Sequence, residues 1–447
     1  FVFPGQGGQW IGMARQLMAE EPAFREAIER CDAAARPYID WSIVDQLEAA
    51  PEASDFLLDR IDVIQPVLVA ISIAYAERLR SAGVTPDAVV GHSMGEVAAA
   101  YIAGVIDLDE AMHIICRRSA LMRTAAGKGA MALVDLGPAD IEARLGGREN
   151  RVCVAVSNSP RSSVISGEPA AVQAVLDELT AEGVFCRLVK VDVASHSPQM
   201  DLLAAALAAD LGGLAPHSSL LPIYSTVLGR VAESAEFDAA YWAANLRRPV
   251  RFGETIGRLI ADGVSVFVEC GPHPVLLPAI QQTAQASGAE KVVTISTGDR
   301  NEPEYAALLK AIGGLWVQGA GINWKAISAV ARAVRLPLYP WQRERHWIDA
   351  ANPMRGGVQR PLASRKQDTP RADGVPMLQQ SIYVTGWADA PPAKLTPPQH
   401  LLLLADQGGV AHALAELMAA GGAPCRIVLP DAVAGPHAGA DILDLRS

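Results

Sequence analysis

The chain has 447 residues, of which 50% are hydrophobic and 19% charged, and its 49 acidic and 38 basic residues give a net charge of −11. At ~150 residues per domain, this length predicts about three folding units and excludes a small single module. The acidic balance argues against a surface for nucleic acid or anionic lipid, because such surfaces are rich in Lys and Arg. No apolar run reaches the ~20 residues of a membrane span, so we expect a soluble, cytoplasmic protein.

The cysteines and the first residues indicate the cellular setting. Six cysteines lie far apart, at positions 31, 116, 153, 186, 270 and 425, without a C-x-x-C pair. This spacing argues against a disulfide framework and against a zinc site, and we predict no bound metal. The chain starts at Phe1 without an initiator Met or a charged and then apolar leader, which predicts a piece of a longer protein without a signal peptide.

Residues 1–128 have a helical pattern with one interruption. Apolar residues recur every three or four positions, as at Met13, Leu17, Phe24 and Ile28. The short apolar run over 87–91 predicts a buried strand, a helix of small residues follows over 95–104, and another helix is expected over 110–126. The sequence therefore predicts a strand, a tight turn and a helix around residues 92–94.

Residues 129–195 have a rhythm of their own. The pattern predicts strands and helices in the order β-α-β-β-α-β, with strands at 131–136, 151–156, 163–166 and 186–193 and helices at 138–145 and 169–183. This order is that of the ferredoxin-like unit. We interpret it as a small subdomain inserted in a larger α/β-hydrolase-like body. That body resumes over 196–295, with a helix at 200–211 and strands at 223–226 and 264–269.

The chain changes character after residue 295. Residues 296–348 are expected to form a linker, with a helix over 305–319 and then an aromatic and basic cluster over 336–347 that two prolines keep extended. Residues 349–375 are rich in Pro, Gly and charge and predict a flexible linker. Residues 376–447 predict one βαβ unit, with strands at 401–406 and 426–430 around a helix at 410–420, too short to close a core.

The pentapeptide from Gly91 to Gly95 carries the sharpest chemical signal. It is a G-x-S-x-G at a strand-to-helix turn, which places Ser93 on a strained elbow with its hydroxyl at the start of a helix. The backbone N–H of Met94 is then in position to stabilise an oxyanion. An ordinary turn is the alternative for a pentapeptide taken alone.

A serine hydroxyl is a weak nucleophile and needs a base. Among nine histidines, His196 has the best position, because it follows the last strand of the inserted subdomain where the chain re-enters the larger body. A histidine that only caps the next helix is the alternative. Asp192 and Asp201 flank it, but neither is placed behind the ring by the sequence.

Two further groups complete the candidate site. The glycine-rich segment 3–8 contains no Lys and is poorly suited to bind a phosphate. Its Gln6 N–H, together with the N–H of Met94, would instead complete an oxyanion hole. A tight turn without a chemical role is the alternative. Arg117 and Arg118 are adjacent on a helix and point ~100° apart. We interpret Arg117 as surface charge and Arg118 as a clamp for a carboxylate.

Six motifs in this order resemble the acyltransferase domain of a modular type I polyketide synthase. They are Phe1-Val-Phe-Pro-Gly-Gln-Gly7, Gly91-His-Ser-Met-Gly-Glu96, Arg118-Ser119, Val193-Ala-Ser-His196, Tyr241-Trp-Ala-Ala-Asn-Leu-Arg-Arg-Pro-Val-Arg-Phe252 and Glu269-Cys-Gly-Pro-His-Pro274. The resemblance covers residues 1–347. The cluster over 339–347 resembles the linker that follows such domains, and the chain from 376, with Tyr383 and Trp387, resembles the opening of a ketoreductase structural subdomain.

The resemblance implies a ping-pong acyl transfer. Ser93 would attack the thioester of an α-carboxyacyl-CoA with His196 as base, the N–H groups of Gln6 and Met94 would hold the oxyanion, and Arg118 would pair with the free carboxylate. The acyl group would then pass to the phosphopantetheine thiol of an acyl carrier protein. A hydrolase has no use for such a buried arginine.

The resemblance also implies the surroundings of this chemistry. The backbone carbonyl that orients the histidine would be that of Asn245, and Gln65, His92 and His273 would lie near the substrate pocket. The acyltransferase would bind no cofactor, and NADP would belong to the missing half of the ketoreductase. A ketosynthase upstream and a ketoreductase downstream would share the polypeptide, in a homodimeric synthase.

The extender unit is indicated by the residues that end at the base. Val193 to His196 resembles the Y-A-S-H pattern of methylmalonyl-selecting domains more than the H-A-F-H of malonyl-selecting ones, and Ser195 leaves room for an α-methyl group. Val193 in place of Tyr and the apolar Met94 count against this, and one methyl group is worth only ~1–3 kcal/mol. We favour methylmalonyl. The alternatives are a malonyl-specific transferase, a serine hydrolase or editing thioesterase, and a catalytically silent scaffold.

Overall fold

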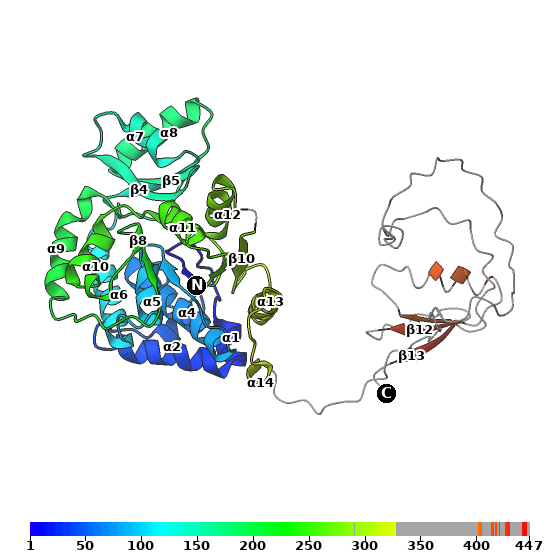
Figure 1. Ribbon diagram of the computed structural model, residues 1–447. Helices are drawn as coiled ribbons and strands as arrows, with labels where there is room; N and C mark the ends of the chain where they lie inside the picture. The colour runs from blue at the N-terminus through cyan, green and yellow to red at the C-terminus, as the bar shows by residue number, and fades with distance from the viewer. Residues whose placement is uncertain are drawn as a thin grey trace, which may run out of the picture. The chain divides into compact units, whose positions relative to one another are not determined.

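The computed structural model describes residues 1–289 and 291–327 and, nearer the C-terminus, 401–404, 413–414, 416–417, 420, 425–429 and 440–444. The chain divides into two compact units, Phe1–Leu338 and Tyr339–Ser447 (Figure 1). Among the described residues, no helix is long and apolar enough to cross a membrane.

The first unit contains a six-stranded sheet in the order β10-β9-β1-β2-β7-β8. Its strands are β1 (Val2–Phe3), β2 (Val89–Gly91), β7 (Ile223–Ser225), β8 (Arg230–Val231), β9 (Val266–Glu269) and β10 (Val293–Ser296). All neighbours are parallel except β7 and β8, and Val2 is paired with Val90 and Phe3 with Gly91. The carboxyl ends of β1 and β2 are therefore adjacent, which brings the glycine-rich segment beside the predicted elbow.

Twelve α-helices accompany this sheet within the described part of the first unit's larger body. They are α1 (Arg15–Glu20), α2 (Pro22–Ala35), α3 (Ile43–Glu48), α4 (Ile61–Ser81), α5 (Gly95–Ile102), α6 (Leu108–Arg123), α9 (Asp201–Asp210), α10 (Ala239–Arg247), α11 (Phe252–Ala261), α12 (Leu277–Ala286), α13 (Glu304–Val317) and α14 (Trp324–Ile327). Two 3₁₀ turns, Pro198–Met200 and Ser234–Glu236, complete it. The long helix α4 is apolar on nearly all sides and is buried between α2, α5 and α6, as expected of a core helix.

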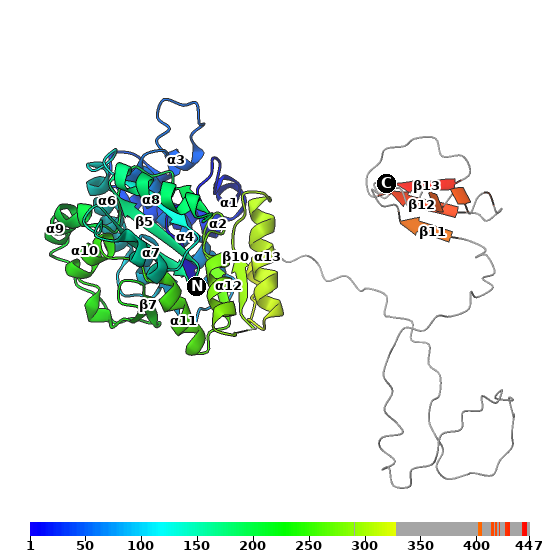
Figure 2. The same ribbon diagram turned by 90° about the horizontal axis from the view of Figure 1, so that it is seen from above.

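The inserted subdomain is ferredoxin-like, as predicted. It consists of β3 (Ala130–Val134), α7 (Pro138–Leu145), β4 (Val152–Ser159), β5 (Ser162–Gly167), α8 (Pro169–Ala181) and β6 (Cys186–Leu188). Its strands are antiparallel in the order β4-β5-β3-β6, with a hydrophobic core of their own. Figure 1 shows α7 and α8 as a layer at one end of the larger body, and in Figure 2, which looks onto that end, they lie over it. Helices α11 and α12 of the larger body contact β4.

The last strand of this subdomain is shorter than predicted. The sequence predicts a strand over 186–193, but β6 ends at Leu188. After it the chain turns, with the N–H of Val191 donating to the carbonyl of Val189 at 2.8 Å, and Val193 is 1% exposed in the core of the larger body. The first residues of this run therefore belong to the sheet of the small subdomain, and Val193 at its end belongs to the core of the larger body.

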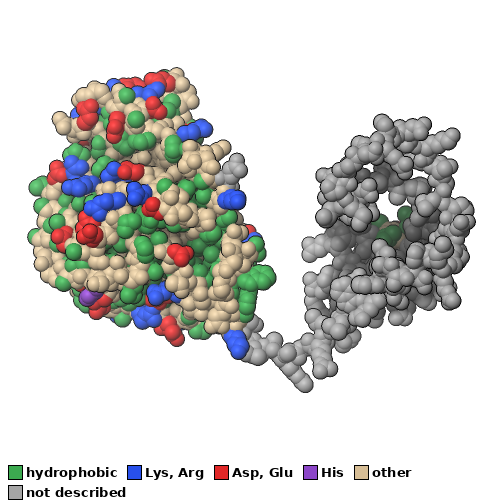
Figure 3. Space-filling model, in the orientation of Figure 1, with side chains coloured by type: hydrophobic (Ala, Val, Ile, Leu, Met, Phe, Trp, Pro, Cys, Tyr) green, Lys and Arg blue, Asp and Glu red, His purple; other side chains and the backbone are tan. Residues whose placement is uncertain are grey.

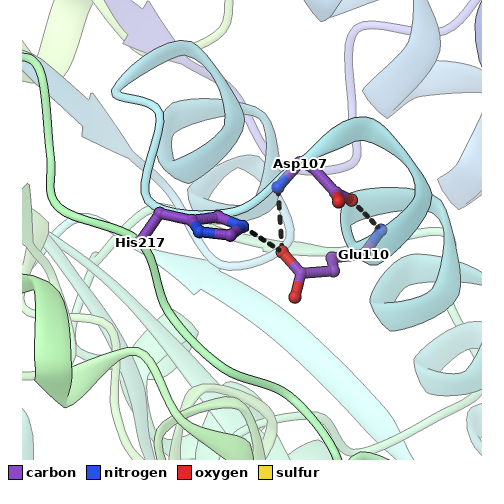
Figure 4. A group of neighbouring side chains, drawn as sticks. All are labelled: Asp107, Glu110 and His217. Carbon is purple, nitrogen blue, oxygen red and sulfur yellow. Dashed lines mark hydrogen bonds and ion pairs between the residues drawn. The ribbon is translucent and has the colours of Figure 1, made fainter.

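The start of α6 is explained by a capping box. The carboxylate of Asp107 accepts from the N–H of Glu110 at 2.8 Å, and the carboxylate of Glu110 accepts from the N–H of Asp107 at 2.9 Å (Figure 4). The helix therefore begins at Leu108 rather than at 110. His217 Nε2 lies 3.7 Å from a Glu110 oxygen, and we assign this acidic group to the helix cap.

The boundary predicted at residue 296 needs correction. Helix α13 contributes Leu308, Ile312 and Leu315 to the main core, and Glu304 at its start accepts hydrogen bonds from the backbone N–H groups of Ala14 and Gln16. Residues up to 317 thus belong to the body and not to a linker. The predicted aromatic cluster over 336–347, the linker over 349–375, Tyr383 and Trp387 lie outside the described residues.

The second unit has one more strand than predicted. Its described strands β11 (Leu401–Leu404), β12 (Cys425–Leu429) and β13 (Ala440–Asp444) form a parallel sheet in chain order. Residues 413, 414, 416, 417 and 420 are helical, within the predicted helix. Strand β13 was not predicted because two of its five residues are aspartates, so it does not form an apolar run. On the face of the first unit shown in Figure 3, acidic and basic side chains are interspersed.

Candidate active site

Ser93 lies on a strained turn between β2 and α5. Its φ is +53°, in the left-handed region that non-glycine residues rarely adopt. A Cβ on Gly91 would lie 2.2 Å from the backbone N of Glu96, and one on Gly95 would lie 2.1 Å from the carbonyl oxygen of Phe3. Both glycines are therefore required by the turn, which has the geometry of a nucleophile elbow.

The predicted base is next to the predicted nucleophile. His196 Nε2 lies 2.8 Å from Ser93 Oγ, and His196 Nδ1 lies 2.9 Å from the carbonyl oxygen of Arg248. This arrangement suits a neutral ring that donates through Nδ1 and accepts the serine proton at Nε2. The sequence named the Asn245 carbonyl for this role. The 2.9 Å hydrogen bond goes to Arg248, three residues further on, and a backbone interaction with Asn245 also acts to raise the pKa of His196.

Asn245 has a different position from the one predicted. Its side-chain nitrogen donates to the carbonyl oxygen of Ser93 at 3.1 Å and to the carboxylate of Glu96 at 2.8 Å. Asn245 is therefore not part of the cavity wall. Its hydrogen bond with the buried Glu96 holds it on the other side of the Ser93 turn. Glu96 also accepts from Tyr241 and Thr226, and burial raises the pKa of its carboxyl. Sequence reasoning missed Glu96, although a lone charge among small apolar residues was a usable signal.

Arg118 points from α6 at the nucleophile. It is 1% exposed, its Nη2 lies 3.0 Å from Ser93 Oγ, and its Nη1 donates to Gln65 Oε1 at 2.6 Å. Its Nε has no hydrogen-bond partner among the described residues. Burial lowers the pKa of the guanidinium to about 10 against the opposing field of Glu96. The neighbouring Arg117 is partly exposed and pairs with Asp210, in line with the surface role expected for it.

The two expected oxyanion donors follow the carboxyl ends of the adjacent strands β1 and β2. Gln6 and Met94 both line the cavity above Ser93. Within the described part of the chain, neither of their backbone N–H groups donates to a protein acceptor. Two free N–H groups next to a serine hydroxyl form an arrangement suited to a developing negative charge.

The cavity at Ser93 has a volume of about 300 Å³ and lies between the two subdomains. Gln65, His92 and Ser195, which were expected near a substrate pocket, line this cavity. Other lining residues are Ile61, Leu133, Val156, Asn158, Val164, Arg187, Val189, Val191 and Leu276. Val193 and His273 do not. The side chain of Val193 is buried in the main core, and His273 lies in the wall of a neighbouring cavity.

That neighbouring cavity is basic. It has a volume of about 610 Å³, shares Gln6 and Val189 with the first, and is lined by Arg187, Lys190 and Arg300. Most arginines of the first unit pair with a carboxylate, whereas these three cations have no ion pair among the described residues. The cavity therefore suits an anion.

Both histidines at the site are held neutral. Burial, and then the charge of Arg118, lower the pKa of His196 to about 3. Burial lowers the pKa of His92 to about 4, while its hydrogen bond with Asn158 acts in the other direction. Both rings therefore act as neutral imidazoles at neutral pH.

The comparisons with known proteins agree with this geometry. The family model of the acyl transferase domain matches residues 1–320. The acyltransferase domain from module 8 of the salinomycin polyketide synthase is 39% identical, with a TM-score of 0.70 over 73% of this chain and 76% of that one. The malonyl CoA-acyl carrier protein transacylase from Coxiella burnetii is 29% identical, with a TM-score of 0.62 over 70% of this chain and 96% of that one. Fold and site thus define an acyltransferase.

The sequence relatives narrow the class. Erythronolide synthase EryA2 from Saccharopolyspora erythraea is 42% identical over 79% of this chain, and polyketide synthase GfsB from Streptomyces halstedii is 41% identical over 84% of it. The chain belongs to the acyl transferase domain family, among the acyltransferase domains of modular polyketide synthases. It spans 10% and 7% of the length of these two synthases.

Proposed function

We propose that the chain loads an α-carboxyacyl extender unit from its CoA thioester onto the phosphopantetheine of an acyl carrier protein, through an acyl-serine intermediate. One observation carries this proposal: Arg118 is buried, has no carboxylate partner among the described residues, and lies 3.0 Å from the nucleophilic oxygen of Ser93. A carboxylate bound there would place the thioester carbonyl over Ser93 and leave little room for an attacking water.

The proposed chemistry has two halves. Ser93 Oγ attacks the thioester carbonyl while His196 Nε2 takes its proton, and the N–H groups of Gln6 and Met94 hold the oxyanion. The intermediate collapses as the C–S bond breaks, and the imidazolium returns the proton to the leaving CoA sulfur. The carrier-protein thiol then attacks the acyl-serine with His196 again as base, which restores the Ser93 hydroxyl. These groups complete the reaction without a cofactor.

The basic cavity supports the choice of donor and acceptor. CoA and the carrier protein both present a phosphate at the far end of a pantetheine arm. Arg187, Lys190 and Arg300 line a cavity that shares Gln6, Val189 and Arg187 itself with the cavity at Ser93. We place the phosphates of both substrates there, in turn.

We further propose methylmalonyl as the favoured extender unit. Ser195 contributes a small side chain to the cavity wall, and Val193, which departs from the methylmalonyl pattern, lies outside that wall. The neighbour described as the acyltransferase domain of SpnD is in complex with 2-(pent-4-yn-1-yl)malonyl and is 30% identical to this chain, with a TM-score of 0.65. A substituted malonyl group thus fits a relative of the same fold.

The wider setting is also a proposal. We expect the chain to work within a longer polypeptide, between a ketosynthase and a ketoreductase, in a homodimeric synthase. The share of the relatives that it spans supports this setting. The parallel sheet of the second unit is compatible with the first strands of a ketoreductase structural subdomain, with NADP bound elsewhere in that enzyme.

Intact-mass measurement after mixing with methylmalonyl-CoA and malonyl-CoA tests the proposal. We expect an adduct on Ser93 whose mass is that of methylmalonyl, lost in Ser93→Ala and transferred to an added carrier protein. A malonyl adduct would identify the malonyl-specific alternative. Release of the free acid faster than transfer of the acyl group to the carrier protein would identify a hydrolase. If no adduct formed, the chain would be a catalytically silent scaffold. Ser195→Phe should shift the ratio of adducts toward malonyl by about 10-fold, the order of discrimination that one methyl group provides.

A further inference from the structure

Strand β4 of the small subdomain contacts residues of the larger body that lie next to the catalytic groups in the chain. The side-chain oxygen of Asn158 lies 3.0 Å from His92 Nε2, and His92 is next to Ser93 in the chain. Nearby, the N–H of Val250 donates to the carbonyl of Ala155 at 2.9 Å, and the N–H of Ser157 donates to the carbonyl of Val250 at 2.9 Å. The strand therefore holds two segments of the larger body at once.

The backbone contact at Val250 bears on the base. Arg248, whose carbonyl accepts from His196 Nδ1, is two residues before Val250 in an extended stretch. A Cβ on Gly253 would lie 3.0 Å from the Cα of Ser159, so this stretch lies directly against β4. Fixing Val250 on the strand thus limits how far the Arg248 carbonyl can move from the imidazole.

The side-chain contact at His92 bears on the nucleophile and the oxyanion donors. A Cβ on Gly5 would lie 3.1 Å from His92 Nδ1 and 3.2 Å from its carbonyl oxygen, so the segment that carries Gln6 rests on the ring. On another side the ring packs on Phe252, with centroids 5.4 Å apart. The position of this imidazole therefore determines the space available to Gln6.

We propose that β4 is a support for the catalytic site and that Asn158 is its positioning residue, which orients His92 and through it the Ser93 elbow and the Gln6 donor. The inference rests on the proposed acyl transfer. It makes the ferredoxin-like subdomain part of the catalytic machinery as well as a wall of the cavity.

The charges around His92 provide a specific test. Among the described residues, Arg118, Arg187 and His196 are the titratable groups that line the same cavity as His92. Gly5, Phe252 and Asn158, which contact the ring, are uncharged. Burial lowers the pKa of His92 to about 4, so the ring is neutral in working conditions. A carboxylate at position 158 would favour the charged ring, and a charged ring would disfavour the neighbouring imidazolium that forms when Ser93 is acylated.

The experiment measures the rate constant of Ser93 acylation by methylmalonyl-CoA in Asn158→Leu, Asn158→Asp and a control, Gln173→Leu. Gln173 is exposed on α8 of the same subdomain, where its side chain donates to Asp177. We expect Asn158→Leu to lower the rate constant about 10- to 100-fold, with the half-saturating concentration nearly unchanged, since a buried polar group loses its partner. Gln173→Leu should match the wild type.

The aspartate variant separates orientation from packing. We expect the acylation rate constant of Asn158→Asp to approach the wild-type value above pH 8. Below pH 8 it should fall as His92 becomes protonated, whereas the wild-type rate constant should not fall in this range. The inference would be overturned if Asn158→Leu acylated Ser93 with the wild-type rate constant. It would also be overturned if the Leu and Asp variants lost the same fraction of the rate constant at every pH. If Asn158→Leu does not fold by circular dichroism, Asn158→Ser takes its place with the same expectation. A wild-type chain that forms no Ser93 adduct would instead refute the proposed function.

Discussion

Arg118 Nη2 and Ser93 Oγ lie 3.0 Å apart, and Gln65 fixes the other terminal nitrogen of the guanidinium at 2.6 Å. The cation and the nucleophile thus have a set relation before any substrate enters. An α-carboxyacyl thioester has the same two features, a carboxylate and an electrophilic carbon, separated by one carbon atom. This match between enzyme and substrate underlies the first prediction.

Arg118→Ala should abolish loading of α-carboxyacyl groups. We expect the acylation rate from methylmalonyl-CoA to fall at least about 100-fold, because loss of one partner of a buried charge pair costs roughly 2–5 kcal/mol. Arg117→Ala is the matched control, since Arg117 is adjacent but pairs with Asp210 on the surface. Acylation by an uncharged acyl-CoA should persist in Arg118→Ala. Unchanged methylmalonyl loading would contradict the assignment of Arg118.

The acylation rate should resist acidification. His196 accepts the serine proton only while it is unprotonated, and burial and Arg118 lower its pKa to about 3. We therefore expect kcat/KM for acylation to stay flat from about pH 8 to about pH 5, where a histidine of ordinary pKa would already have lost activity below about 6.5. Stopped-flow acylation over this range measures it. A limb centred near pH 6.5 in the free enzyme would refute the assignment.

The basic cavity should act on substrate capture and leave the chemical step unchanged. Arg300→Glu should raise KM for methylmalonyl-CoA roughly three- to tenfold at low salt with kcat nearly constant, because reversal of an exposed charge mainly affects association and is screened by salt. Arg144→Glu is the control, since Arg144 is also exposed but lies on α7 and pairs with Glu182. Equal effects of the two variants would assign the change to overall charge.

The elbow should not tolerate a methyl group at Gly95. Its Cβ would lie 2.1 Å from the carbonyl oxygen of Phe3, which belongs to the sheet and cannot move alone. We expect Gly95→Ala to lower the free energy of unfolding by about 3 kcal/mol. Gly263→Ala offers a comparison, because nothing lies within 4 Å of its Cβ, although its φ of +95° adds strain. Denaturant titration measures both, and equal losses would mean that the contact at Phe3 is unimportant.

Three residues that the sequence predicted for the chemistry lie within hydrogen-bond distance of one another or of a common atom in the structure. Ser93, His196 and Arg118 come from an elbow, a loop and a helix, and the fold brings them together. The Arg248 carbonyl was missed as an acceptor for His196 because a backbone carbonyl leaves no trace in residue type, and the sequence named only Asn245. Asn158 was missed for another reason: the strand predicted over 151–156 stops before it, whereas β4 continues to Ser159.

The fold was predicted best where local pattern determines it. The strand order of the inserted subdomain follows from its alternation of short apolar runs and helices, and β3 to β5 agree with it closely. Val193 was misplaced because strand periodicity was extended past Leu188, where a turn begins. The boundary at 296 failed because a change in composition does not show that Leu308 and Ile312 fill the main core.

The unpaired Nε of Arg118 has a thermodynamic consequence. The buried guanidinium forms no ion pair with a carboxylate of the described residues, so the carboxylate of a bound ligand would supply that partner. Binding of a small dicarboxylate to the folded protein would then raise the free energy of unfolding by an amount that its affinity determines. Free methylmalonate at 100 times its Kd should add about 2.7 kcal/mol to stability, and Arg118→Ala should lose that gain. A melting curve would thus report occupancy of the site without any turnover.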